Sequence, residues 1–185
     1  MPQNKVKKWP LQSEREVYPT RVFRVLEKHY FKPDTTKNFT ASVLKCPNWV
    51  NIIGINPKGE ILLERQYRFG TDRIELEIPG GVIEAGEDPL MAAKREMKEE
   101  TGYVSDQWHL LGVVNANPAI MTNQCFSYLA LNLQPKGEIH FDADEEIEYL
   151  FKPAAEVRAD IRNGIITNVF IIAAFHWLTL KNELD

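Results

Sequence analysis

The sequence has few residues that could crosslink the chain or anchor it in a membrane. Its 185 residues include only two cysteines, Cys46 and Cys125, too few for a disulfide framework or a cysteine-rich zinc site. The longest apolar run, over 169–180, contains His176 and is too short to span a bilayer. Residues 1–9 are positively charged but no apolar run follows them, so no signal peptide is expected. We therefore expect a cytoplasmic protein with no membrane partner.

The sequence also lacks an excess of charge of either sign. Lysine and arginine number 22 against 26 aspartate and glutamate, which gives a net charge of −4. Proteins that bind nucleic acid through its phosphates are usually basic, so no nucleic-acid partner is expected. Hydrophobic residues make up 44% and charged residues 26%, a mix that excludes a disordered chain. The length fits one domain with a short added arm.

The order of the predicted elements places strands first and helices last. Candidate strands cover 16–26, 38–45, 50–55 and 60–65, with Pro19 breaking the alternation of the first and a turn at 56–59 joining the last two. Strand-like segments return over 104–132, and two helices, 153–163 and 167–181, close the chain. This order predicts an α+β fold, an α/β/α sandwich with a mixed β-sheet and an N-terminal β-strand arm. His176 lies in the apolar last helix and is expected to be buried.

A further helix is predicted over 88–100, between the two groups of strands. Asp88 is a good N-cap and Pro89 suits the first helical position. Gly102 lies where a left-handed residue commonly ends a helix. Apolar residues recur along one face, so we expect an amphipathic helix of about three turns.

Three carboxylates, Glu96, Glu99 and Glu100, are spaced to lie on one side of this helix. Like charges repel there, and negative charge in the last turn opposes the helix dipole by roughly 0.3–1 kcal/mol each. A divalent cation removes both penalties, and hard oxygen ligands select Mg²⁺ or Mn²⁺. The flexible backbone at 79–81 could approach a ligand closely. The alternative is a glutamate-rich helix face that is simply solvated.

Residues 81–103 resemble the signature of the Nudix hydrolase family. That signature is Gly, five residues, Glu, seven residues, Arg-Glu, an apolar residue, any residue, Glu-Glu, any residue, Gly and an apolar residue. It is matched here by Gly81, Glu87, Arg95, Glu96, Met97, Glu99, Glu100, Gly102 and Tyr103. So long a spaced match is specific, although Tyr103 is less typical than Ile, Leu or Val. The resemblance implies the Nudix fold and metal-dependent hydrolysis of a diphosphate linked to another moiety.

The resemblance also implies roles for individual residues. Arg95 and Glu87 would brace the helix, and Arg95 and Glu99 would support catalysis. Mg²⁺, with Mn²⁺ as a possible substitute, would be bound by the backbone carbonyl of Gly80. The carboxylates of Glu96, Glu99 and Glu100 would complete its protein ligands.

Segments outside the signature resemble the branch that hydrolyses ADP-ribose and other nucleoside diphosphate sugars. Residues 64–68 look like the branch's strand ending in Gln-x-Arg, in which the arginine, here Arg68, touches substrate phosphate; a surface arginine is the alternative. Pro118 lies where this branch has a proline, but no acidic residue follows it. This departure favours a broader range of nucleoside diphosphate sugars than ADP-ribose alone. Asn123 could bind sugar hydroxyls or be an ordinary turn residue.

The same branch takes its general base from a distant acidic loop and is typically a homodimer. The matching loop lies within 141–149, where Glu145 is the first candidate and Glu146 the second. Residues 1–45 would form the strand arm that crosses to the partner, and 46–185 the Nudix hydrolase domain.

The expected function is Mg²⁺-dependent hydrolysis of a nucleoside diphosphate sugar to a nucleoside monophosphate and a sugar phosphate. A GDP-mannose or dinucleotide substrate with the same chemistry is one alternative. A non-catalytic Nudix domain that senses a ligand is another, and the intact set of three glutamates argues against it. Nucleic-acid decapping is disfavoured by the net charge and by the lack of a basic tail.

Overall fold

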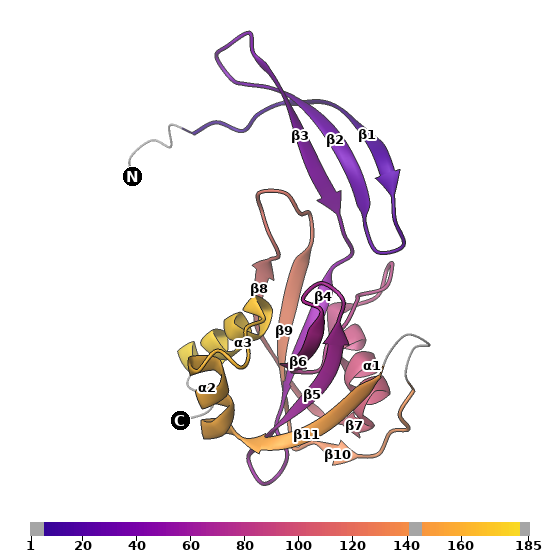
Figure 1. The fold of residues 1–185 in the computed structure, drawn as a ribbon, viewed down its shortest axis with the longest axis vertical. Helices are drawn as coiled ribbons and strands as arrows, with labels where there is room; N and C mark the ends of the chain where they lie inside the picture. Colours follow the sequence, from indigo (N-terminus) through magenta and orange to yellow (C-terminus); the bar gives the residue numbers. More distant parts are fainter. Residues whose placement is uncertain (1–5, 141–145, 182–185) are drawn as a thin grey trace. The chain divides into compact units, whose positions relative to one another are not determined.

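A computed structural model describes residues 6–140 and 146–181. The chain divides into two compact units, drawn in Figure 1, which are described separately below. The first comprises residues 1–47 and 115–123, and the second comprises 48–114 and 124–185.

The first unit is built on a three-stranded antiparallel sheet in the order β1-β2-β3, formed by Leu11–Pro19, Arg24–Phe31 and Asn38–Lys45. The expectation of one interrupted strand over 16–26 is therefore wrong. Pro19 ends β1, and the Thr20 hydroxyl accepts the N–H of Phe23 at 2.8 Å, which closes a turn that leads into β2. The apolar residues on either side of this turn belong to two paired strands, and this explains their broken alternation.

The loop 115–123 belongs to this first unit because it is hydrogen-bonded to the end of β3. The N–H of Leu44 donates to the carbonyl of Ile120 at 2.7 Å, and the N–H of Thr122 donates to the carbonyl of Leu44 at 3.1 Å. The Thr122 hydroxyl also accepts the N–H of Cys46. A segment from the middle of the sequence thus continues the N-terminal sheet.

The second unit has a mixed sheet, as the sequence predicts. One set of three strands has the order β11-β5-β6 and another has the order β4-β9-β8, while β7 and β10 form a short pair. The strands are β4 (Trp49–Gly54), β5 (Glu60–Arg68), β6 (Arg73–Glu77), β7 (Tyr103–Val104), β8 (Gln107–Asn115), β9 (Gln124–Leu131), β10 (Gln134–Pro135) and β11 (Ile147–Pro153).

The backbone after β6 joins the two sets of strands. The N–H of Ile52 donates to the carbonyl of Pro79 at 2.8 Å, and Val50 and Gly81 exchange two hydrogen bonds. β4 pairs in parallel with β9, whereas β5 pairs antiparallel with both of its neighbours. The segment leading into the glycine loop is not a regular strand, but it is consequently held against β4 by backbone hydrogen bonds.

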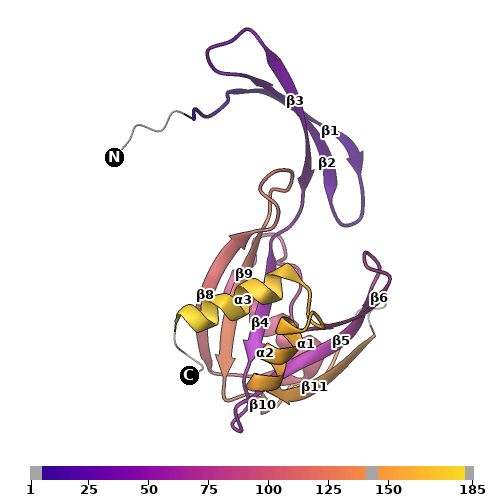
Figure 2. The same ribbon diagram turned by 60° about the vertical axis from the view of Figure 1, so that its left-hand side comes forward.

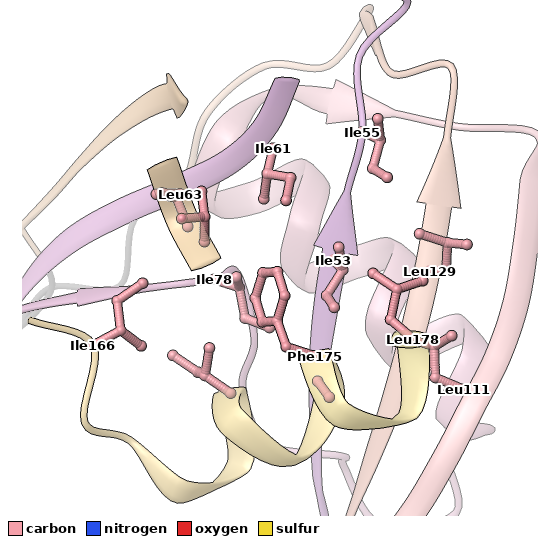
Figure 3. Packing of buried hydrophobic residues seen from close by; sticks show 13 residues of the cluster. Ile53, Ile55, Ile61, Leu63, Ile78, Leu111, Leu129, Ile166, Phe175 and Leu178 are labelled. Atoms are coloured by element: carbon pink, nitrogen blue, oxygen red, sulfur yellow. The ribbon is translucent and has the colours of Figure 1, made fainter. Parts of the chain in front are cut away.

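Helices cover both faces of this sheet (Figure 2) and are formed by α1 (Pro89–Thr101), α2 (Ala154–Arg162) and α3 (Val169–Leu180). Ile52 packs with α1 residues in one apolar cluster, and its neighbour Ile53 packs with α3 residues in the other. Successive strand residues point to opposite faces, so α1 and α3 lie on opposite sides. Figure 3 shows Phe175 and Leu178 of α3 within the cluster that contains Ile53. The predicted α/β/α arrangement is confirmed.

The helix ends agree with the sequence signals. The Asp88 side chain accepts the N–H groups of Leu90 and Met91, and Gly102 has a left-handed φ of 71° at the end of α1.

The prediction for His176 is wrong, because its side chain is exposed. Only the face of α3 that carries Phe175 packs on the sheet. Within the described ranges, no helix is both long enough and apolar enough to cross a membrane.

Trp177 of α3 packs directly on Gly112 of β8, where any Cβ would overlap its indole ring. We expect Gly112→Ala to lower the free energy of unfolding by about 1–3 kcal/mol, the usual cost of overpacking. Gly70→Ala is the matched control, because nothing lies near a Cβ at that position, and it should change stability by less than about 0.5 kcal/mol. Urea unfolding followed by tryptophan fluorescence measures both. Equal stability of the two variants would contradict the close contact.

Candidate active site

The guanidinium of Arg95 links the glutamates of α1 to the loop before it. Its Nε and Nη2 donate to the two carboxylate oxygens of Glu87 at 2.9 and 3.0 Å. Its Nη1 donates to Glu96 at 2.9 Å and to Glu99 at 3.1 Å, and Nη2 also donates to the carbonyl of Val82. One positive charge therefore lies among three carboxylates and fastens the loop to the helix.

These contacts shift the pKa values of both partners. The hydrogen bonds from Arg95 hold the pKa of Glu87 below its ordinary value. The pKa of Arg95 is raised, first by its hydrogen bonds to Glu87 and then, against the effect of burial, by the charge of Glu96 and by hydrogen bonds to Glu96 and Glu99. Both groups are consequently charged across the whole physiological range.

The glycine loop lies directly against the carboxylates of α1. Glu100 is buried, and its carboxylate accepts the N–H of Gly80 at 3.0 Å. A Cβ on Gly80 would overlap the carbonyl oxygen of Val50, and a Cβ on Gly81 would overlap the carboxylate of Glu96. Position 80 therefore requires glycine, because the contact is with backbone, whereas a side chain at position 81 would displace the carboxylate of Glu96.

The structure brings the predicted metal ligands of the loop and α1 into one region, although it does not arrange them around a common point. Among residues 6–140 and 146–181, no three acidic, histidine or cysteine side chains converge as a metal centre would require. Glu96 and Glu99 face Arg95, while Glu100 faces the N–H of Gly80. The donors are all hard oxygen atoms, and the glycines of the loop, which have no side chains, let the backbone approach them closely. Their chemistry fits Mg²⁺ or Mn²⁺.

Arg68, at the end of β5, lies beside this region. Its Nε and Nη2 donate to both carboxylate oxygens of Glu77 on β6, at 3.2 and 2.9 Å. Burial lowers the pKa of Arg68, but the hydrogen bond to Glu77 and the charges of Glu77, Glu64 and Glu100 raise it overall. Because the charge of Glu100 acts on Arg68, the arginine predicted to bind phosphate lies within electrostatic range of a glutamate of α1.

A row of buried polar side chains on β5 and β6 was not predicted from the sequence. Glu64 is paired in register with Glu77, and Gln66 with Glu75, so each pair lies on one face of the sheet. All four side chains are buried, and Arg73 donates to Glu75 at 2.7 Å. The sequence offered no clear signal, because the intervening Arg65 and Tyr67 are polar as well. The strand register is what places residues 64, 66 and 68 on one face.

The remaining predicted residues lie elsewhere. Pro118 is exposed in a turn and Asn123 is buried, and both belong to the first unit, whereas α1 belongs to the second. Glu146 is exposed immediately before β11, whereas Glu145 lies outside the described residues. The functions predicted for these four residues stay predictions.

The family model for the NUDIX domain matches residues 47–167, so the chain belongs to the Nudix family of hydrolases. The methanol dehydrogenase activator of Bacillus methanolicus is 29% identical over 143 residues, 77% of each chain. Two proteins named ADP-ribose pyrophosphatase also match. That of Bacillus subtilis strain 168 is 27% identical over 146 residues, 77% of this chain and 78% of the relative. That of Mycobacterium tuberculosis is 31% identical over 137 residues, which are 72% of this chain and 66% of the relative.

A solved structure shares the fold of the chain. A crystal structure of an ADP compounds hydrolase superposes with a TM-score of 0.85 and 22% sequence identity, and the match covers 98% of each chain. Together with the relatives, the family match confirms the predicted resemblance to the ADP-ribose pyrophosphatase branch of the Nudix hydrolases.

The pairing of Arg95 with Glu87 should make stability depend on pH. Glu87→Gln should lower the free energy of unfolding by about 1.5–3 kcal/mol at neutral pH, the usual value of hydrogen bonds to charged groups. Because the folded-state pKa of Glu87 is lowered, this stabilisation is complete above the unfolded-state pKa, about 4.3. It is lost as the pH falls through the folded-state pKa.

Urea unfolding at a series of pH values between neutral and about 3.5 tests this expectation. The difference between wild type and Glu87→Gln should be largest at neutral pH and should shrink below the unfolded-state pKa. Glu148→Gln, which removes an exposed pair with Arg65, is the control and should cost less than about 1 kcal/mol. A difference for Glu87→Gln that does not change with pH would contradict the assigned ion pair.

Proposed function

We propose that this protein hydrolyses the pyrophosphate bond of nucleoside diphosphate sugars of the ADP-ribose type, with Mg²⁺ as cofactor and Mn²⁺ as a substitute. The products are a nucleoside monophosphate and a sugar phosphate. The observation that carries the proposal is the group of hard oxygen donors at Glu96, Glu99 and Glu100, packed against a glycine loop and electrostatically coupled to Arg68. The relatives named ADP-ribose pyrophosphatase support this substrate class.

Each part of the site contributes a separate effect. The carbonyl of Gly80 and the three glutamates would hold the cation, which neutralises diphosphate charge and lowers the pKa of a bound water when present. Arg95 keeps the glutamates of α1 charged and oriented. The guanidinium of Arg68 would bind a phosphate oxygen of the substrate, because its planar donors match phosphate geometry.

The proton of the attacking water needs a separate acceptor, because cation-bound carboxylates are poor bases. We propose Glu145, or else Glu146, as this general base. Glu146 is exposed immediately before β11, on a segment separate from the glutamates that would hold the cation. Replacing the true base with glutamine would lower kcat while metal-dependent stabilisation is retained.

Other nucleotide substrates share this chemistry. GDP-mannose and dinucleotides also contain a pyrophosphate bond, and the absence of an acidic residue just after Pro118 favours a broad range. A non-catalytic role is disfavoured because a ligand sensor does not require all three glutamates. The cytoplasmic location expected from the sequence stays a prediction.

The function is tested with a panel of ADP-ribose, GDP-mannose, UDP-glucose, NADH and ATP in H₂¹⁸O containing Mg²⁺. We expect a nucleoside monophosphate and a sugar phosphate from ADP-ribose, with ¹⁸O in only one product, because water attacks one phosphorus. Glu100→Gln should remove most of the activity. It should leave the melting temperature without metal unchanged or slightly raised, because it relieves carboxylate repulsion.

Glu84→Gln, an exposed position in the same loop, is the control and should retain activity. Release of a free sugar and a nucleoside diphosphate would mean attack at carbon and would refute the pyrophosphatase assignment. Near-normal turnover of Glu100→Gln at saturating Mg²⁺ would refute the role of Glu100 as a ligand. If no nucleotide in the panel is hydrolysed, the ligand-sensing alternative is favoured.

We also propose that the sheet β1-β2-β3 is a dimerisation arm, because one of its faces carries several apolar side chains, of which Leu11 and Phe39 are exposed. Strand register places Leu11, Tyr30 and Phe39 in one row and Leu26 and Val43 in another on the same face. Leu26 is the single buried apolar side chain among the described residues of this unit, and Phe39 is 52% exposed. A three-stranded sheet needs such a face covered to be stable, and a second copy of the chain can supply the cover.

The opposite face of this sheet carries a polar row, which supplies the control. Glu27 is ion-paired with Arg15 and lies opposite Ser42. Phe39→Ser should shift the protein from dimer to monomer in light scattering after gel filtration, whereas Ser42→Ala should remain dimeric. A wild-type monomer at all concentrations, or a dimer that tolerates Phe39→Ser, would contradict the proposal.

A further inference from the structure

Glu64 is a buried carboxylate on β5 that the predicted site does not include. Its side chain has 0% exposure and lies on the same face of the sheet as Leu62, whose neighbours are Ala93 and Met97 of α1. An apolar residue would fill this position at a much lower desolvation cost, because buried carboxylates are expensive. Packing alone therefore does not account for a glutamate here.

Glu64 adds negative charge to a group that is already rich in carboxylates. It is paired in register with Glu77, which is bonded to Arg68 through both oxygens. The positive charge of Arg68 is stabilised by Glu64 and Glu100 as well as by Glu77. Three buried carboxylates thus act on one guanidinium, and the group as a whole is negative.

A second, independent observation on the same face indicates a bound species. Gln66 lies between Glu64 and Arg68 along β5 and is 94% buried, with an exposed fraction of 6%. Its Oε1 has no hydrogen-bond partner among the described residues. Buried acceptors are normally satisfied. An acceptor without a donor beside excess negative charge fits a cation or the water that hydrates it.

We infer that Glu64 is a positioning residue for the proposed Mg²⁺ site: its charge strengthens cation binding by the loop and α1, although it lies outside the Nudix signature. The inference rests on the proposed metal-dependent function. Mg²⁺ keeps several of its waters when a protein binds it, and carboxylates beyond the direct ligands accept hydrogen bonds from such waters. Gln66 Oε1 offers an acceptor of this kind on the face that carries Arg68, and the carboxylate of Glu64 lies on the same face.

Titration of the full chain with Mn²⁺, followed by the electron paramagnetic resonance signal of free Mn²⁺, tests this role without substrate. Glu64→Gln keeps the shape of the side chain and removes its charge. Its Kd for Mn²⁺ should rise about 10-fold, the lower end of the effect of residues that support metal ligands. Its melting temperature without metal should be unchanged or raised, and the increase on adding Mg²⁺ should be smaller than in wild type.

Two further variants separate charge from structure. Glu64→Asp keeps the charge and should bind Mn²⁺ more tightly than Glu64→Gln, whereas a purely structural role predicts that the shortened side chain is at least as harmful. Glu148→Gln, at an exposed pair with Arg65 of β5, is the matched control and should bind Mn²⁺ as wild type does. In assays, Glu64→Gln should need more Mg²⁺ for half-maximal rate but approach the wild-type kcat at saturation.

The outcomes distinguish the inference from the function on which it rests. If wild type binds no Mn²⁺, the proposed metal-dependent function fails. If wild type binds Mn²⁺ and Glu64→Gln binds it equally well, the function stands and the role of Glu64 is overturned. A Glu64→Gln variant that melts lower without metal and retains the wild-type Kd would likewise show that Glu64 is only structural.

Discussion

The organisation of the site depends on the contact between one guanidinium and several carboxylates. Arg95 is held by both oxygens of Glu87 and reaches Glu96 and Glu99 on its own helix. Without this charge, the helix face would suffer the repulsion of neighbouring glutamates, and the loop before the helix would lose its main attachment. The same ion pairs fix where the glycine loop can lie, and the sheet holds that loop through the hydrogen bonds between Val50 and Gly81.

The features that could be predicted from the sequence are those with local causes. The limits of α1 follow from Asp88, which caps the first turn, and from Gly102, whose left-handed φ ends the last turn. The spacing of Glu96, Glu99 and Glu100 places them together on any helix, so their proximity needs no knowledge of the rest of the fold. The mixed sheet followed from the order of strands and helices.

Other features depend on contacts between distant segments, and periodicity alone does not reveal them. Glu64 follows three apolar residues in its strand and is buried between two neighbouring strands, where it is paired in register with Tyr149 of β11 and Glu77 of β6. His176 occurs in a helix that is apolar all round, so the pattern could not show which face meets the sheet. The hairpin at Pro19 was missed because the broken alternation over 16–26 fits one interrupted strand as well as the ends of two paired strands.

The assignment of the loop 115–123 to the N-terminal unit has a consequence for the modularity of the protein. The chain leaves the second unit after β8, pairs with the end of β3 and returns at β9, so the N-terminal sheet is not an appendage joined at one point. Deleting residues 1–47 would strip the backbone of Ile120 and Thr122 of its partner, Leu44. Exchange of the arm between relatives therefore has to transfer both segments of sequence, residues 1–47 and the loop 115–123, together.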